Sequence, residues 1–269
     1  MMIGSHVRVM VERMRWEEEV KSGFDAALAA GEFIAWYQPK YSARTKQIAG
    51  AEALVRWRHN GALVPPNRFI PVLEKSGQIS RLDEEIFRRV CHLQASLRAR
   101  GLPQLPISVN LSRASIFTRD VADLYTAITA EYGVDPKLVP IEITESAAIR
   151  AISIRRFADA LIDRGFVLHM DDFGSGYSSL ASLQVIPFQS IKLDKTLIDN
   201  IGRESSESLL KHTIAYARES GKVVIAEGVE TAEQYLFLRA MGCDLIQGYY
   251  FSRPVEEAAY VSLLEKVKV

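Results

Sequence analysis

Cysteine is scarce in this chain. Cys91 and Cys243 are the two cysteines among 269 residues, and they form no CxxC motif. Small disulfide-stabilised folds and thiolate zinc sites depend on several spaced cysteines, so neither class fits this sequence. The composition predicts a protein of the reducing cytoplasm in which both thiols fill the core.

Net charge and long apolar runs are also lacking. Basic and acidic residues number 33 each, which argues against a broad surface for a nucleic-acid polymer. No apolar run approaches the roughly 18 residues needed to cross a bilayer. The N-terminal segment reaches Arg8, Glu12, Arg13 and Arg15 before any apolar signal core forms. We therefore expect a soluble chain without a membrane segment, and any membrane link would lie outside it.

Short apolar runs alternate with longer amphipathic stretches along the chain. This alternation is typical of repeated βα units on a parallel sheet. Eight runs predict strands, at Phe33–Gln38, Ile48–Val55, Ile107–Leu111, Pro140–Thr144, Val167–Asp171, Ser190–Leu193, Val223–Glu227 and Leu245–Gly248. Helical patterns occur at Leu82–Arg100, Val121–Tyr132, Ser153–Arg164, Ser206–Ser220, Ala232–Met241 and Val255–Val267. Eight strands in an unbroken rhythm favour a closed barrel over an open sheet.

The domain organisation follows from the absence of a linker. No stretch rich in proline, glycine and serine divides the chain after residue 30, so we predict one barrel domain over residues 31–269. Residues 1–30 precede it, and within them Val7–Leu28 has the pattern of a charged amphipathic helix. We interpret this segment as a connector or a dimer-forming lead-in, which a sensory or regulatory domain outside this chain would precede.

Polar side chains recur at the carboxyl ends of the predicted strands. In a parallel βα barrel these ends form one face, where active sites lie. The residues are Glu52, Asn110, Glu142, Asp171, Asp172, Lys192, Glu227 and Gln247. Unpaired buried charges are costly, so a purely structural reason for the whole set is disfavoured. Carboxylate and amide oxygens are the ligands that Mg²⁺ and Mn²⁺ prefer, and the pattern predicts a site for such a cation.

Asp171 and Asp172 are the most informative pair in this set. They end the apolar run Phe166–Met170 and precede a glycine-rich segment, 174–176. Adjacent like charges repel each other unless a cation neutralises them, which favours a metal site. The same residues also suit a helix N-cap followed by a turn. Taken alone, the two interpretations have equal weight.

Several motifs occur together and in one order along the chain. Ala51-Glu-Ala-Leu-Val-Arg-Trp57 and Asp171-Asp-Phe-Gly-Ser-Gly-Tyr177 are the two longest. The others are Trp36-Tyr-Gln-Pro39, Ser108-Val-Asn-Leu-Ser112, Glu142-Ile-Thr-Glu145, Ile191-Lys-Leu-Asp194, Ala226-Glu-Gly-Val-Glu230 and Gln247-Gly-Tyr-Tyr-Phe-Ser-Arg-Pro254. This ordered set resembles the EAL-domain phosphodiesterases specific for cyclic di-GMP, over nearly the whole chain. The resemblance implies an α/β fold, a modified (β/α)8 TIM-type barrel with an antiparallel first strand, and linear pGpG as the product.

The resemblance also implies two divalent metal ions, Mg²⁺ or Mn²⁺, which Ca²⁺ would replace without supporting turnover. Ligands of the first ion would be Glu52, Asn110, Glu142 and Asp171. Ligands of the second would be Asp171 as the bridge, Asp172 and Glu227, directly or through water. The catalytic set implied is Glu52, Asp171, Lys192 and Glu227. Whether Glu227 or a water held by Lys192 is the base stays open.

Other residues match supporting roles in the family. Substrate contacts are assigned to Gln38, Arg56, Asn110 and Gln247. Lys192 and Gln247 match residues that hold metal-bound waters. Glu145 matches the acid that fixes the loop from Asp171 to Ser179, and Glu230 is grouped with it as a supporting residue. Arg56 also suits a salt bridge to Glu52, and Glu145 also suits a helix cap. Lys40, Leu193 and Lys195 depart from residues frequent in the family, and we expect none of them to touch the metal ligands.

Three functions are compatible with the sequence. A cyclic di-GMP hydrolase is favoured, because each acid, amide and lysine of the expected metal site is present. The alternatives are a receptor that binds cyclic di-GMP without hydrolysing it and a scaffold that needs no carboxylates at the barrel opening. We also expect a homodimer, in which the segment Phe173–Ser179 couples the dimer contact to metal occupancy.

Overall fold

The strands form one sheet that closes on itself. The computed structural model describes residues 2–118, 120–144, 151–174 and 186–267. The sheet order is β1-β9-β8-β7-β6-β5-β4-β2-β3, and pairing of β1 with β2 closes the barrel. The strands are β1 (Phe33–Ser42), β2 (Ile48–His59), β3 (Ala62–Val64), β4 (Ile107–Asn110), β5 (Ile141–Thr144), β6 (Leu168–Phe173), β7 (Ser190–Leu193), β8 (Val223–Ala226) and β9 (Leu245–Ile246).

The direction of β1 distinguishes this barrel from an all-parallel one. β1 runs antiparallel to both of its neighbours, β2 and β9. The pairs from β2 through β4 to β9 are parallel. The expected α/β barrel with an antiparallel first strand is therefore confirmed.

β3 is an addition that the strand pattern did not predict. It pairs with the end of β2 as a hairpin, in which His59 lies opposite Ala62. Asn60 and Gly61 form the turn with φ angles of 49° and 76°, the conformation that an Asn-Gly hairpin turn favours. β3 lies at the edge of the sheet and takes no part in closing the barrel.

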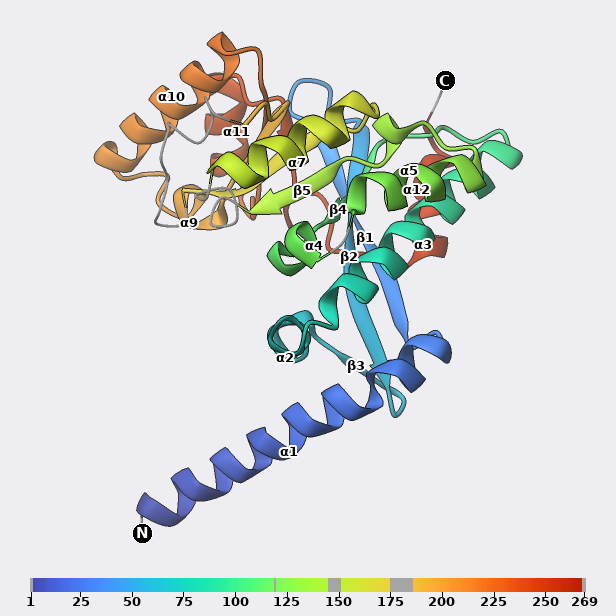
Figure 1. Ribbon diagram of the computed structural model, residues 1–269. Coiled ribbons are helices and arrows are strands. Elements are labelled where there is room, and N and C mark those ends of the chain that lie inside the picture. The colour runs from blue at the N-terminus through green and yellow to red at the C-terminus, as the bar shows by residue number, and fades with distance from the viewer. Residues whose placement is uncertain (1, 119, 145–150, 175–185, 268–269) are drawn as a thin grey trace.

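Helices surround the barrel (Figure 1). They are α1 (Met2–Ala29), α2 (Ile70–Ser76), α3 (Ile79–Ala99), α4 (Arg113–Thr118), α5 (Val121–Tyr132), α7 (Ala151–Asp163), α9 (Lys195–Ile198), α10 (Glu204–Glu219), α11 (Ala232–Met241) and α12 (Glu257–Leu264), with single 3₁₀ turns at Pro66–Arg68 and Pro136–Leu138. None of the described helices combines the length and the apolarity that a bilayer span requires.

The long helix α1 has two parts with different surroundings. Its C-terminal part is packed into the core through the buried side chains of Val20, Phe24 and Ala27. Its N-terminal part projects away from the barrel (Figure 1), where Met10 and Met14 are 65% and 60% exposed. The helix therefore begins before residue 7, where the sequence pattern predicted its start. Its C-terminal half packs against the barrel.

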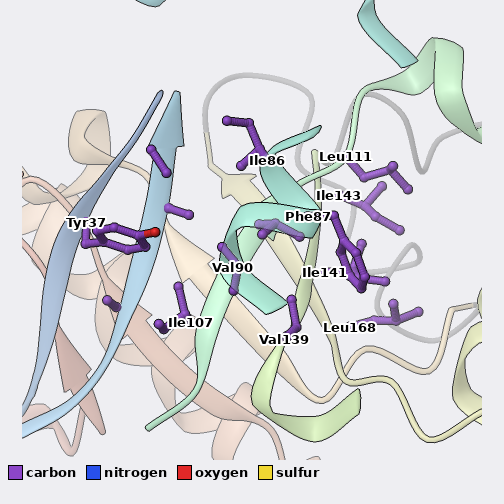
Figure 2. Close-up of a cluster of buried hydrophobic side chains, with 14 of the residues drawn as sticks. Tyr37, Ile86, Phe87, Val90, Ile107, Leu111, Val139, Ile141, Ile143 and Leu168 are labelled. Atoms are coloured by element: carbon purple, nitrogen blue, oxygen red, sulfur yellow. The ribbon is translucent and has the colours of Figure 1, made fainter. Parts of the chain in front are cut away.

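Alternation along β5 and β7 separates the apolar layer from the polar interior. On β5, Ile141 and Ile143 are fully buried in the same cluster as Phe87 of α3 (Figure 2). Glu142, between them, projects to the opposite face, since successive side chains on a strand point in opposite directions. The same alternation places Lys192 of β7 inside the barrel while Ile191 joins the outer apolar layer. The polar interior follows directly from this period of two.

Candidate active site at the carboxyl ends of the strands

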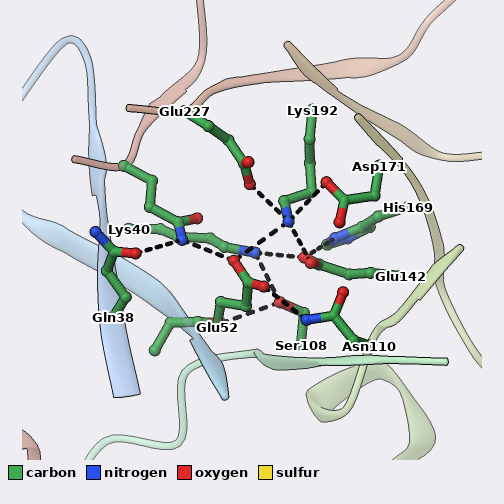
Figure 3. A network of polar contacts seen from close by, with 12 residues as sticks. Gln38, Lys40, Glu52, Ser108, Asn110, Glu142, His169, Asp171, Lys192 and Glu227 are labelled. Atoms are coloured by element: carbon green, nitrogen blue, oxygen red, sulfur yellow. Dashed lines mark hydrogen bonds and ion pairs between the residues drawn. The ribbon is translucent and has the colours of Figure 1, made fainter. Parts of the chain in front are cut away.

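Carboxylates from separate strands surround one lysine. The ammonium of Lys192 lies 3.0 Å from Asp171 Oδ1 and 2.6 Å from Glu227 Oε1. It also lies 3.2 Å from Glu52 Oε2 and contacts Glu142 Oε2 (Figure 3). The Lys192 side chain is only 1% exposed. Parallel pairing brings these strand ends to one edge of the barrel, so residues more than a hundred positions apart in the chain share a single ammonium.

Negative charge exceeds positive charge in this cluster. Burial raises the pKa of Glu52, of Asp171 and, most strongly, of Glu227. Burial alone would lower the pKa of Lys192, but the carboxylates around it, Asp171 first, raise it well above its usual value. One ammonium shared among several buried carboxylates leaves charge that a further cation would neutralise.

Glu142 differs from the other acids because each of its oxygens meets a lysine. Lys40 Nζ donates to Glu142 Oε1 at 2.8 Å, and Lys192 contacts Oε2. His169 Nδ1 lies 3.4 Å from Oε1. Burial raises the pKa of Glu142, but Lys192 and Lys40 outweigh it and hold this pKa well below its usual value.

The contact of Lys40 with Glu142 corrects the expectation that Lys40 lies away from the metal ligands. Lys40 follows Gln38 on β1, which runs antiparallel to its neighbours. Gln38 lies opposite Glu52, and Lys40 lies opposite Gly50, closer to the amino ends of the parallel strands. An inward side chain two residues after Gln38 therefore reaches Glu142 from the end of the barrel where the parallel strands begin.

Side-chain amides fix the carboxylate of Glu52. Asn110 Nδ2 donates to Glu52 Oε1 at 2.7 Å, and Gln247 Nε2 donates to Glu52 Oε2 at 2.7 Å. Gln247 Nε2 also lies 3.1 Å from Gln38 Oε1. Four of the residues singled out in the sequence, Gln38, Glu52, Asn110 and Gln247, therefore form one hydrogen-bonded group beside Lys192.

Asp172 has a special backbone conformation. Its φ is 56°, in the left-handed region that non-glycine residues rarely adopt. The register of β6 against β7 shifts between Met170 and Phe173, which accommodates this residue. Asp171 and Asp172 both lie within a strand, so the helix N-cap interpretation of the pair is wrong. A local bulge of this kind re-aims a side chain near a site, and here it turns Asp172 out of the regular alternation.

Three of the expected residues lie outside the cluster or outside the described residues. Among the described residues Arg56 forms no salt bridge with Glu52; its Nη1 donates to Val55 O, and its guanidinium lies 5.7 Å from the Trp36 ring centroid. Glu230 pairs with Lys195 at 3.0 Å. Glu145 lies outside the described residues, as does most of the segment Phe173–Ser179, so its expected role stays a prediction.

Asp83 is a supporting residue that the sequence does not reveal. It lies on α3, yet its Oδ2 accepts a hydrogen bond from the backbone N–H of Ser112 at 3.0 Å and one from Ser115 Oγ at 2.6 Å. These bonds hold the chain immediately after Asn110. Burial raises the pKa of Asp83 to about 6.

The raised pKa of Asp83 predicts a pH-dependent stability difference. The folded protein binds this proton more tightly than the unfolded chain, so stability is lost as the pH rises from about 4 to about 6. Because the Asp83 residue is only partly buried, we expect its ionisation to lower the unfolding free energy by roughly 2 kcal/mol. Asp83→Asn cannot ionise, so the difference in unfolding free energy between wild type and variant should change by that amount across the window. Urea unfolding of both proteins at pH 4, 5, 6 and 7 measures it, and a pH-independent difference would contradict the assignment.

The donor set suits a hard divalent cation. The cluster offers carboxylate and amide oxygens, and within the described part of the chain the buried acceptor Gln247 Oε1 has no hydrogen-bond partner. Within the described ranges, no three His, Cys, Asp or Glu side chains are already grouped as a metal requires, because the carboxylates converge on Lys192. The residues therefore fit a cation by chemistry and charge, and binding it would require the carboxylates to turn away from the ammonium.

Comparison with known proteins places this chain in a family. A model described as the EAL domain matches residues 23–254. The cyclic di-GMP phosphodiesterase NbdA of Pseudomonas aeruginosa is 34% identical over 256 residues, which cover 94% of this chain and 32% of NbdA. The chain thus spans about a third of the length of that relative.

Solved structures of similar fold include two ligand complexes. The PaMucR phosphodiesterase in complex with c-di-GMP has a TM-score of 0.84 and 29% identity, covering 90% of this chain and 99% of that one. The calcium and cyclic di-GMP complex of BlrP1 from Klebsiella pneumoniae has a TM-score of 0.75 and 27% identity, covering 83% of this chain and 56% of that one. With the family model matched from α1 to beyond β9, this chain belongs to the EAL domain family.

Proposed function

We propose that this barrel hydrolyses cyclic di-GMP to linear pGpG with the help of two divalent metal ions. The observation that carries the proposal is the group of buried carboxylates, contributed by separate strands, around Lys192. A scaffold would have no need for surplus buried charge at this edge of the barrel. The relative NbdA, which is named as a cyclic di-GMP phosphodiesterase, and the PaMucR structure bound to c-di-GMP support the choice of substrate.

The carboxylates would hold the ions. Glu52, Asn110, Glu142 and Asp171 would bind one of them, and Asp171, Asp172 and Glu227 the other. Such a pair of cations supplies a water of lowered pKa and neutralises charge on the phosphodiester. Mg²⁺ and Mn²⁺ suit this oxygen-rich donor set, and a calcium complex of a relative supports divalent binding in the family.

Residues of this chain would supply the remaining steps. Lys192 orients the attacking water and screens the charge that develops on the phosphate oxygens. The Glu227 carboxylate lies beside Lys192, with Oε1 2.6 Å from the ammonium, so it can take the proton of a water that Lys192 orients. Arg56 is free of Glu52, and its planar guanidinium suits a phosphate oxygen. Gln38 and Gln247 contact the nucleotide.

Hydrolysis should depend on the metal supplied. We expect pGpG to form with Mg²⁺ or Mn²⁺, to stop after chelation, and to remain slow with Ca²⁺, since Ca²⁺ accepts longer distances and more ligands and activates water poorly. Chromatography of the nucleotides after incubation with each ion measures this. Full activity after exhaustive chelation would contradict the two-metal proposal. Tight binding of cyclic di-GMP without pGpG under every condition would support the receptor alternative instead.

The proposal extends to assembly and compartment. The active form would be a homodimer, with α1 as its lead-in from an N-terminal sensory or regulatory domain and with Glu145 ordering the segment Phe173–Ser179. Light scattering that finds a monomer at full activity would remove the dimer from the proposal. Cys91 and Cys243 are both free and buried, which supports the reducing cytoplasm as the place of action.

A further inference from the structure

Lys40 is held near the amino ends of the parallel strands. Its side chain is 3% exposed, and its ammonium donates to Ser108 Oγ at 2.7 Å and to Glu142 Oε1 at 2.8 Å. Ser108 Oγ in turn lies 3.3 Å from the carbonyl oxygen of Ala51 on β2. Ser108 of β4 and Glu142 of β5 therefore fix the position of this positive charge.

A cavity next to Lys40 shows from which side this lysine reaches Glu142. The cavity has a volume of about 150 Å³, and its lining includes Lys40 with Pro106, Pro140 and Ser190. Pro106, Pro140 and Ser190 lie at the amino ends of parallel strands, opposite the edge where Asp171 and Glu227 lie. Lys40 thus reaches Glu142 from behind, whereas Lys192 contacts it within the cluster.

Lys40 and Lys192 differ in the number of carboxylates that each ammonium contacts. Lys192 contacts all the carboxylates of the cluster, and their rearrangement around a cation would change each of those contacts. Lys40 pairs with Glu142 alone among the described acids. Its charge therefore stays beside one carboxylate whatever the others do.

We propose that Lys40 is a permanent counter-ion of Glu142 that weakens the binding of divalent cations by the acidic cluster. The inference rests on the proposed function, because it takes the cluster as the place where a cation binds. A fixed positive charge at hydrogen-bond distance from a ligand carboxylate reduces the attraction that this carboxylate exerts on a second cation. Lys40 would keep occupancy of the site dependent on the concentration of free metal.

A purely structural role for Lys40 predicts a different result from the counter-ion role. If the lysine only offsets the burial of Glu142, its removal lowers the stability of the protein and leaves the affinity for metal unchanged or weaker. The counter-ion role instead forecasts tighter metal binding in every variant that lacks the charge. Affinity and stability must therefore be measured together.

The test compares three substitutions with the wild type. Lys40→Met removes the charge, Lys40→Gln removes the charge and keeps a hydrogen-bond donor, and Lys40→Arg keeps the charge, with the adjoining cavity as room for the guanidinium. Calorimetric titration of chelator-treated protein with Mn²⁺ gives the dissociation constants. Thermal unfolding with and without Mn²⁺ gives a second readout that needs no turnover.

We expect the Mn²⁺ dissociation constant to fall by about tenfold or more in the Met and Gln variants and to stay near the wild-type value in Lys40→Arg. The rise in melting temperature on adding Mn²⁺ should be larger in the two uncharged variants. Where Lys40→Met does not fold, Lys40→Gln decides the matter. A folded uncharged variant with unchanged or weaker affinity overturns the inference alone, whereas a wild type that binds no Mn²⁺ overturns the proposed metal site as well.

Discussion

Replacing Lys192 with methionine is expected to lower the unfolding free energy of the metal-free protein by roughly 3–5 kcal/mol. Among the described residues, Lys192 is the cation that contacts Glu52, Asp171 and Glu227. Its loss leaves these buried carboxylates without a counter-ion, while Glu142 keeps Lys40. Urea unfolding of chelator-treated wild type and variant measures the difference.

The matched control for this experiment is Lys211→Met. Lys211 is 48% exposed and lies 3.9 Å from Glu207, so the change should stay within about 0.5 kcal/mol. Adding Mn²⁺ should restore part of the stability of Lys192→Met, since a metal cation can take over the neutralising role, but turnover should not return. Unchanged stability of metal-free Lys192→Met would show that the ammonium does not hold the cluster together.

Glu52→Gln is expected to reduce the rate of cyclic di-GMP hydrolysis by about a thousandfold or more, the scale reached when one member of a catalytic unit is removed. Gln keeps one acceptor oxygen and can still accept one of the two hydrogen bonds that Asn110 and Gln247 donate to Glu52, so the fold should remain. Metal-free stability should be equal or slightly higher, because one of several repelling carboxylates is gone. Initial rates with Mn²⁺, together with circular dichroism, measure both effects.

Glu265→Gln provides the comparison for Glu52→Gln. Glu265 is 47% exposed and pairs with Arg100 far from the cluster, so its rate should match the wild type. A near-normal rate in Glu52→Gln would argue against its place among the metal ligands. A rate lost together with the circular dichroism signal would reflect unfolding and would contradict the expectation that the variant keeps its fold.

The barrel can be predicted from the sequence because the period of two persists in its parallel strands. Ile141 and Ile143 flank Glu142, and the same pattern around Lys192 marks an interior position on β7. The hairpin strand β3 escapes such an analysis, since its three residues are mostly exposed and carry no alternation. Its signal is the Asn60-Gly61 turn, which the strand pattern alone does not use.

The site is harder to predict, since contacts across the barrel depend on depth as well as on strand order. Lys40 is an example: because β1 runs antiparallel, Lys40 lies closer than Gln38 to the amino ends of the parallel strands, where Glu142 is within reach. Asp83 is another. Its charged neighbours Arg81, Glu84 and Glu85 give the appearance of a solvent-facing helical turn, and the serines that it binds lie 29 and 32 residues further along the chain.

The most direct test of the account is hydrolysis in water enriched in ¹⁸O. The protein is incubated with cyclic di-GMP and Mn²⁺, and the nucleotides are analysed by mass spectrometry. Attack of water on phosphorus, with departure of the 3′ oxygen, predicts pGpG that carries one ¹⁸O on its 5′-phosphate. Cyclic di-GMP that binds to the metal-loaded protein and stays intact, or a product with no ¹⁸O on its phosphate, would contradict the account.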